Sequence, residues 1–126
     1  MAYFTSIERT LNKALTDAAI DPLQIVLVTP VMGDESYVLD SAVCESENSL
    51  TLRYGSGGTK KRKKVEKNGY ELTIVKGEAQ VTASKDRIKF VSEGEPGIVL
   101  FGDRGSVMKK MEALNRRSVL RYRDDD

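Results

Sequence analysis

The stretch LQIVLVTPV, residues 23–31, is an almost unbroken apolar run rich in β-branched side chains. A strand with one face in water alternates apolar and polar residues, whereas a strand buried on both faces does not. The run therefore predicts a strand that is buried on both sides. Pro30 marks a stop or an edge near its end, because proline has no N–H to donate to a neighbouring strand.

Shorter segments on the C-terminal side predict the rest of a sheet. Period-2 alternation and turn residues indicate strands at 36–44, 49–54, 70–74, 78–83, 87–91 and 98–101. In the first of these, Tyr37, Leu39 and Val43 are expected to face the core. The second alternates cleanly and leaves Arg53 on the water side. A turn is expected at 94–97, before the last strand.

Helices are predicted at both ends of the chain. Apolar residues recur every three or four positions from Phe4 to Ala18, which is typical of one helical face, and Asp21-Pro22 ends the pattern. A second helix begins near Ser106, while residues 118–123 fit either a helix or a strand. The expected fold is α+β: an N-terminal helix, an antiparallel six- or seven-stranded sheet or small barrel, and a C-terminal helix.

The 126 residues fit one domain, 1–126, with a frayed acidic tail at 124–126. The sequence shows no signal peptide and no apolar run long enough for a membrane span. The single cysteine, Cys44, cannot form an internal disulfide, so the cytoplasm is the expected compartment. We expect no membrane partner and no cofactor.

The chain contains no histidine, which removes the usual general base and the common zinc ligand. An enzyme would have to rely on carboxylates, lysines or backbone amides. The carboxylates at positions 34, 35, 40, 45 and 47 match no calcium-loop spacing, and Cys44 has no histidine to activate it. A glycine turn at 102–106 could hold a phosphate, but Asp103 would repel an anion. We therefore expect a plain strand-to-helix turn, with Asp103 or Ser106 as the residue that caps the following helix. The sequence thus predicts no catalytic residue and no metal site.

The most conspicuous feature is a glycine-rich basic loop, Gly55–Gly69, between two alternating strands. Fifteen residues are many for a hairpin connection, and long loops tend to be functional or disordered. Six of the eight residues from 60 to 67 are basic. The candidate phosphate-binding residues of this loop are Lys60, Lys61, Arg62, Lys63, Lys64 and Lys67.

Charge is also divided along the chain, because residues 1–56 carry three basic and eight acidic residues, whereas residues 57–126 carry seventeen and eleven. A second basic cluster near the C-terminus adds candidate nucleic-acid contacts, with Tyr122 among them as a stacking residue. Its members are Arg116, Arg117, Arg121 and Arg123. The plain alternative is the polar face of a surface helix.

These patterns favour a small non-enzymatic module that binds DNA or RNA through phosphates with little sequence specificity. A solvated loop without a partner explains the charge run about as well. The alternative function is a protein–protein assembly or inhibitory module, a subunit of a larger particle or an adaptor, whose loop orders on docking against an acidic protein surface. A homo-oligomer is compatible with either function.

Overall fold

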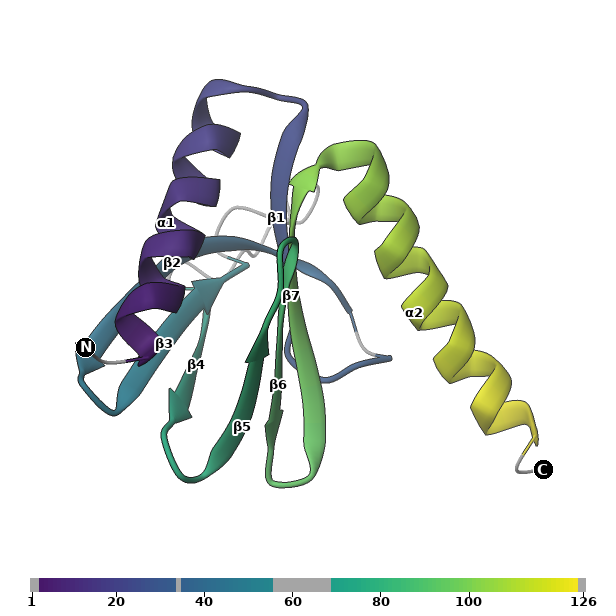
Figure 1. Cartoon of the computed structure of the whole chain (residues 1–126). Helices are drawn as coiled ribbons and strands as arrows, with labels where there is room; N and C mark the ends of the chain where they lie inside the picture. The colour runs from purple at the N-terminus through teal and green to yellow at the C-terminus, as the bar shows by residue number, and fades with distance from the viewer. Residues whose placement is uncertain (1–2, 34, 56–68, 125–126) are drawn as a thin grey trace.

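The computed structural model describes residues 3–33, 35–55 and 69–124, with the side chains of Tyr3 and of residues 115–124 outside the description. It confirms the α+β fold with one helix at each end of an antiparallel sheet (Figure 1). The elements in chain order are α1 (Tyr3–Ile20), β1 (Gln24–Thr29), β2 (Tyr37–Ser46), β3 (Ser49–Tyr54), β4 (Tyr70–Val75), β5 (Ala79–Ala83), β6 (Arg87–Ser92), β7 (Glu95–Asp103) and α2 (Arg104–Asp124).

The seven strands form one open sheet in the order β4-β3-β2-β1-β7-β6-β5. Every ladder between neighbours is antiparallel. Two hairpin-connected series, β1 to β4 and β5 to β7, are joined where β7 pairs with β1. The first and last strands of the sheet, β4 and β5, form no ladder with each other, and the isolated bridge nearby joins Lys76, which follows β4, to Ala79. The small barrel that the sequence also allowed is therefore not formed among the described strands.

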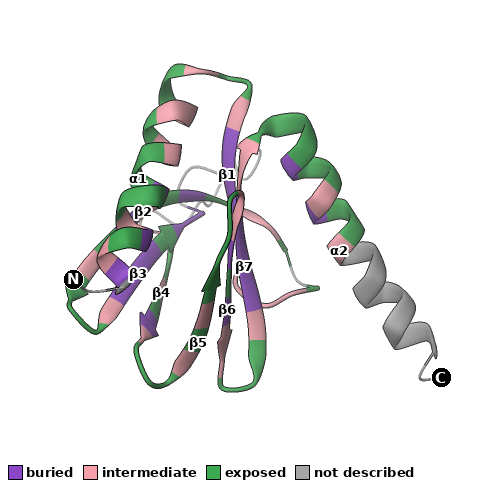
Figure 2. Cartoon of the chain, in the orientation of Figure 1, coloured by how far each residue is buried: buried purple, intermediate pink, exposed green. Residues whose placement is uncertain are grey.

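Strand β1 occupies residues 24–29 of the run at 23–31, and this part is buried on both faces as predicted. Leu23, which the pattern predicts to belong to the buried strand, precedes it and is 65% exposed. Five of its six residues, Ile25 to Thr29, are buried. Figure 1 shows α1 and α2 on opposite sides of the sheet, and Figure 2 shows buried residues along β1 and β7. The two helices remove both faces of β1 from water, which is why the sequence there does not alternate.

The larger core lies between the sheet and α1. The helix inserts Phe4, Ile7 and Leu11, all at most 3% exposed. Buried residues from six strands, β1, β2, β3, β4, β6 and β7, surround this face. Helix α1 itself packs mainly against β1 and β2, at the centre of the sheet. The periodicity of residues 4–18 thus predicted both the helix and the side that it buries.

A smaller core lies on the opposite face, between α2 and the central strands. It consists of Ile25, Leu27, Ile98, Leu100, Val107 and Met111. Helix α2 continues through residues 118–123, so the helical alternative for that segment is correct. Asp124 is the last residue of the helix, and residues 125–126 lie outside the description.

A β-bulge changes the inward face of β2. The register with β3 shifts between Leu39 and Ser41, which inserts Asp40 as an extra residue. Downstream of a bulge the alternation moves by one position. Ala42 is therefore buried at 1% exposure, whereas Val43 is 45% exposed. The expectation that Val43 faces the core is wrong for this reason.

Two polar side chains of α1 form hydrogen bonds with the backbone of β2 on the edge that faces β1. The paired register between β1 and β2 covers only two residue pairs, so β2 leaves β1 after Val38. Glu8 Oε2 accepts a hydrogen bond from the Cys44 backbone N–H at 2.7 Å. Asn12 Nδ2 donates to the Ala42 carbonyl at 3.1 Å. These bonds satisfy backbone groups for which β1 supplies no partner.

The turn before β7 is shorter than expected. It consists of Glu93 and Gly94, both with positive φ (54° and 81°), and the strand begins at Glu95. Pro96 lies inside the strand, where its carbonyl accepts the Met32 N–H at 2.7 Å. A residue in an extended strand directs its N–H and C=O to the same side. The N–H that Pro96 lacks would thus have pointed away from β6, so the β6–β7 ladder loses no bond.

Gly97 in β7 is required by close packing. A Cβ at this position would lie 2.3 Å from Phe90 Cε2 and 2.4 Å from the Pro30 carbonyl oxygen. We predict that Gly97→Ala lowers the free energy of unfolding by roughly 3 kcal/mol, because backbone and a buried ring must both move. Urea denaturation followed by circular dichroism measures this loss.

Gly77→Ala is the matched control, because Gly77 has φ +93° but a Cβ there would meet nothing within 4 Å. Its cost is expected to be about 1 kcal/mol, from backbone strain alone. A loss for Gly97→Ala no larger than that for Gly77→Ala would contradict the packing argument.

Candidate nucleic-acid interface

The basic loop connects β3 to β4, two neighbouring strands of the sheet. Gly55 and Gly69, its first and last residues, are described and both have positive φ (83° and 64°). Gly55 is buried, and its N–H donates to the Val38 carbonyl at 3.1 Å. The loop therefore begins at a position that is fixed to β2. The candidate residues Lys60, Lys61, Arg62, Lys63, Lys64 and Lys67 themselves lie outside the described residues.

The C-terminal candidates belong to α2. Arg116, Arg117, Arg121 and Arg123 all fall within the helix, whose last residue is Asp124. Their side chains, and that of Tyr122, lie outside the description. The four arginines are thus helical residues, and their contacts with nucleic acid stay a prediction.

Three tyrosines gather where the loop leaves the sheet. Tyr54 and Tyr70 are directly paired across β3 and β4, with ring centroids 5.7 Å apart. Tyr37 on β2 joins them, with its ring centroid 5.0 Å from Tyr54 and 5.5 Å from Tyr70. These separations and tilted orientations are typical of attractive aromatic pairs. We call Tyr37, Tyr54 and Tyr70 the tyrosine cluster.

Exposure differs strongly within the tyrosine cluster. Tyr54 is only 7% exposed, whereas Tyr70 is 47% exposed. Tyr37 is half-buried against the larger core. Within the cluster, Tyr54 is therefore the buried ring and Tyr70 the exposed one. Tyr70 lies on β4, the outermost strand on that side of the sheet.

The hydroxyl groups of the two inner rings stay protonated at neutral pH. Burial raises the pKa of Tyr37, and Glu35, which accepts a hydrogen bond from its hydroxyl at 3.1 Å, raises it further. The pKa of Tyr54 is also raised, by burial first and then by Tyr70. These rings consequently carry no negative charge that would repel a phosphate.

The sequence patterns place these three tyrosines in strands and do not predict that they contact one another. The chain did contain a signal, since Tyr54-Gly55 and Gly69-Tyr70 flank the loop as mirror images. That symmetry suggests that the two rings are neighbours across a hairpin. The addition of Tyr37 depends on the β2–β3 register, which pairs Leu39 with Tyr54 and is not readable from local patterns.

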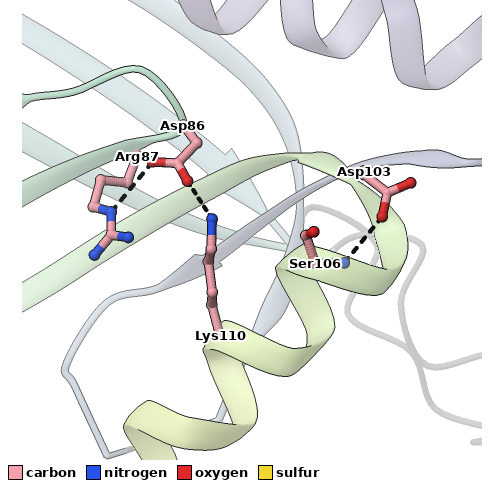
Figure 3. Close-up of polar contacts among 5 residues, drawn as sticks. All are labelled: Asp86, Arg87, Asp103, Ser106 and Lys110. Carbon is pink, nitrogen blue, oxygen red and sulfur yellow. Dashed lines mark hydrogen bonds and ion pairs between the residues drawn. The ribbon is translucent and has the colours of Figure 1, made fainter.

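A separate polar group fixes the start of α2. Of the two predicted capping residues, Asp103 caps the helix: its Oδ2 accepts the Ser106 backbone N–H at 3.1 Å (Figure 3). The carboxylate takes an N–H that a phosphate would need, so the turn at 102–106 acts as a helix cap.

Asp86 holds two cations beside the same helix. It pairs with Lys110 of α2 and with Arg87 of β6, whose Nε lies 3.3 Å from Asp86 Oδ1 (Figure 3). The pKa of Asp86 is lowered, mainly by the hydrogen bond from Lys110. Burial opposes this shift and Arg87 adds to it. Lys110 and Arg87 are thus engaged within the protein.

The carboxylates and the thiol show no assembled site among the residues that the structure describes. No group of three or more acidic or sulfur ligands is close enough to hold a metal ion there. The pKa of Cys44 is raised by burial and by Glu8, although a hydrogen bond with Thr5 opposes the shift. A raised pKa disfavours the reactive thiolate. No described helix has the length and apolar character to span a membrane.

Comparison of the chain with protein-family models, with curated proteins and with solved structures found no match in any of the three. A function can therefore be inferred only from features of this chain, namely the basic loop, the tyrosine cluster at its ends and the arginines of α2.

Gly55 tests how tightly the tyrosine cluster is packed. A Cβ there would lie 3.1 Å from Tyr70 Cδ2 and 3.3 Å from Tyr37 Cδ2. We predict that Gly55→Ala costs about 1–2 kcal/mol through its left-handed backbone and alters the near-UV circular dichroism, because two rings must shift. Gly77→Ala has a similar backbone cost but no ring nearby, so its near-UV spectrum should stay unchanged. An unchanged spectrum for Gly55→Ala would contradict this packing.

The Asp86 pair predicts a pH dependence of stability. A carboxyl whose pKa is lower in the folded chain stabilises it above the unfolded pKa, and this contribution is lost as pH falls through the folded pKa. We expect Asp86→Asn to lower the free energy of unfolding at pH 7 by up to about 1 kcal/mol, since the pair is partly exposed.

The difference between the wild type and Asp86→Asn should be constant from about pH 5 to 8 and shrink below about pH 4. Urea titrations at pH 7, 5 and 3 measure it. Asp17→Asn removes the carboxylate of an exposed helical pair with Lys13, and should cost less than about 0.5 kcal/mol. If the wild type exceeds Asp86→Asn in free energy of unfolding by as much at pH 3 as at pH 7, the stability difference does not come from the ionised Asp86 carboxylate.

Proposed function

We propose that this protein is a non-enzymatic nucleic-acid-binding module whose basic loop contacts phosphates with little sequence specificity. The observation that carries the proposal is the density of six cations within eight residues of a loop that starts and ends at an aromatic cluster. Mutual repulsion makes such a segment costly unless counterions or a polyanion neutralise it. A nucleic-acid backbone releases condensed counterions when cations replace them, which favours binding.

The ligand contacts are assigned by charge and position. Lys60, Lys61, Arg62, Lys63, Lys64 and Lys67 would contact phosphates, with the arginines of α2 as a second region. Lysine binds phosphate as a point charge and reads no base edge, so weak sequence preference follows. The absence of histidine from the whole chain supports a binding role over catalysis. We place the protein in the cytoplasm, because its one cysteine requires no oxidising compartment.

The second candidate function is assembly with other protein chains. Strands β4 and β5 are the outer strands of the open sheet, and each pairs with one described neighbour along its length. Unpaired strand edges can accept a strand from another molecule. Light scattering separates the two functions: a defined oligomer without polyanion affinity supports assembly, and a monomer that binds polyanions supports the proposal.

The test is a salt titration of binding to a fluorescein-labelled duplex and single strand. We predict that affinity for the duplex falls by up to about a thousandfold between 50 and 200 mM salt if six cations engage phosphates. Replacement of residues 60–64 by alanine should remove most of this salt dependence, because each lost contact lowers the slope by about one unit.

A charge-matched control removes five exposed cations elsewhere and leaves the same net charge. Those residues are Arg9, Lys13, Lys76, Lys85 and Lys89. The control should keep most of the affinity and the slope. Binding that is indifferent to salt, or that weakens equally in the control and the loop variant, would refute phosphate contact by the loop.

A further inference from the structure

The tyrosine cluster has the geometry of a stacking platform beside the basic loop. Tyr70 is held by contacts on its inner side: Tyr54 lies at 5.7 Å with an interplanar angle of 31°, and Tyr37 packs edge-on at 5.5 Å. Gly55 adds backbone contact, since a Cβ there would lie 3.1 Å from Tyr70 Cδ2. Yet 47% of Tyr70 is exposed. The ring is therefore supported by two neighbouring rings and by backbone, while nearly half of the residue remains exposed to solvent.

An exposed aromatic ring of this kind suits an unpaired base. Every base has a π-face, so stacking on tyrosine adds affinity without reading sequence. Bases within a duplex are already stacked on their neighbours and offer no free face to a ring on a sheet surface. We infer that Tyr70, supported by Tyr54 and Tyr37, stacks on an unpaired base, so that the preferred ligand is single-stranded nucleic acid.

The surroundings of the ring agree with this assignment. The chain enters and leaves the basic loop at Gly55 and Gly69, immediately beside Tyr54 and Tyr70. A strand whose base stacks on Tyr70 would have its phosphates next to the start of that loop. Glu35, hydrogen-bonded to the Tyr37 hydroxyl at 3.1 Å, places negative charge beside Tyr37, which disfavours a phosphate path on that side. The inference rests on the proposed function and adds the ligand class to it.

The experiment compares a 12-nucleotide single strand with the duplex of the same sequence, by fluorescence anisotropy at 50 mM salt. The wild type should bind the single strand more tightly. Tyr70→Ala should weaken binding of the single strand about tenfold and leave the duplex affinity within about twofold. Tyr70→Phe should retain the single-strand affinity, because stacking needs the ring and not the hydroxyl. Val43→Ala is the matched control, since Val43 is an exposed apolar residue of β2 outside the cluster.

Intrinsic fluorescence gives a second readout. The chain has no tryptophan, so tyrosine dominates its emission. Stacking of a base on Tyr70 should quench this emission in the wild type, and the quench should be smaller in Tyr70→Phe. A far-UV circular dichroism spectrum of Tyr70→Ala that matches the wild type shows that the variant is folded.

The outcomes separate the two proposals. Failure of the wild type to bind either oligonucleotide would refute the proposed function itself. Salt-dependent binding with equal affinity for duplex and single strand, or with no selective loss in Tyr70→Ala, would overturn the stacking inference and leave phosphate binding standing.

Discussion

The pairing of β1 with β7 is the constraint on which the rest of the structure depends. Six consecutive residue pairs, from Gln24–Asp103 to Thr29–Ile98, join the first series of strands to the last. The two strands come from opposite ends of the strand-rich region, so this ladder closes the longest loop among the strand pairings of the sheet. Its stability comes from burial on both faces, since apolar side chains of β1 and β7 face α1 on one side and α2 on the other.

Curvature of the sheet follows from how β2 departs from this centre. The bulge at Asp40 bends the strand, and only two residue pairs tie β2 to β1. Helix α1 fills the resulting gap with Glu8 and Asn12, whose side chains serve the backbone of β2. Helix α1 therefore has two roles. Its apolar residues pack in the larger core, and its polar side chains hydrogen-bond to the backbone of β2.

Strand register brings the three tyrosines together. The β3–β4 ladder places Tyr54 opposite Tyr70, and the β2–β3 ladder places Tyr37 beside them. A glycine at position 55 lets two rings approach the backbone. A charged segment contributes to tighter binding when it adjoins an ordered surface. Such a surface loses less conformational entropy when a ligand binds. The tyrosine cluster supplies such a surface at both ends of the basic loop.

The sequence by itself determined the class of fold, the two terminal helices, the doubly buried strand within residues 23–31 and the strand at 49–54 with Arg53 on its exposed side. Each of these features follows from a pattern within one segment. Apolar residues recur with a period of 3.6 in a helix that buries one face and with a period of 2 in a strand that buries one face, whereas a strand buried on both faces shows no period. The sequence also marked the basic loop, because charge density needs no tertiary context. The tertiary structure alone decided that β7 pairs with β1, that a bulge turns Val43 outward and that residues 95–97 belong to a strand. It also decided that three tyrosines far apart in sequence share one cluster. These features depend on strand register and on contacts between distant segments, which side-chain periodicity within one segment does not encode.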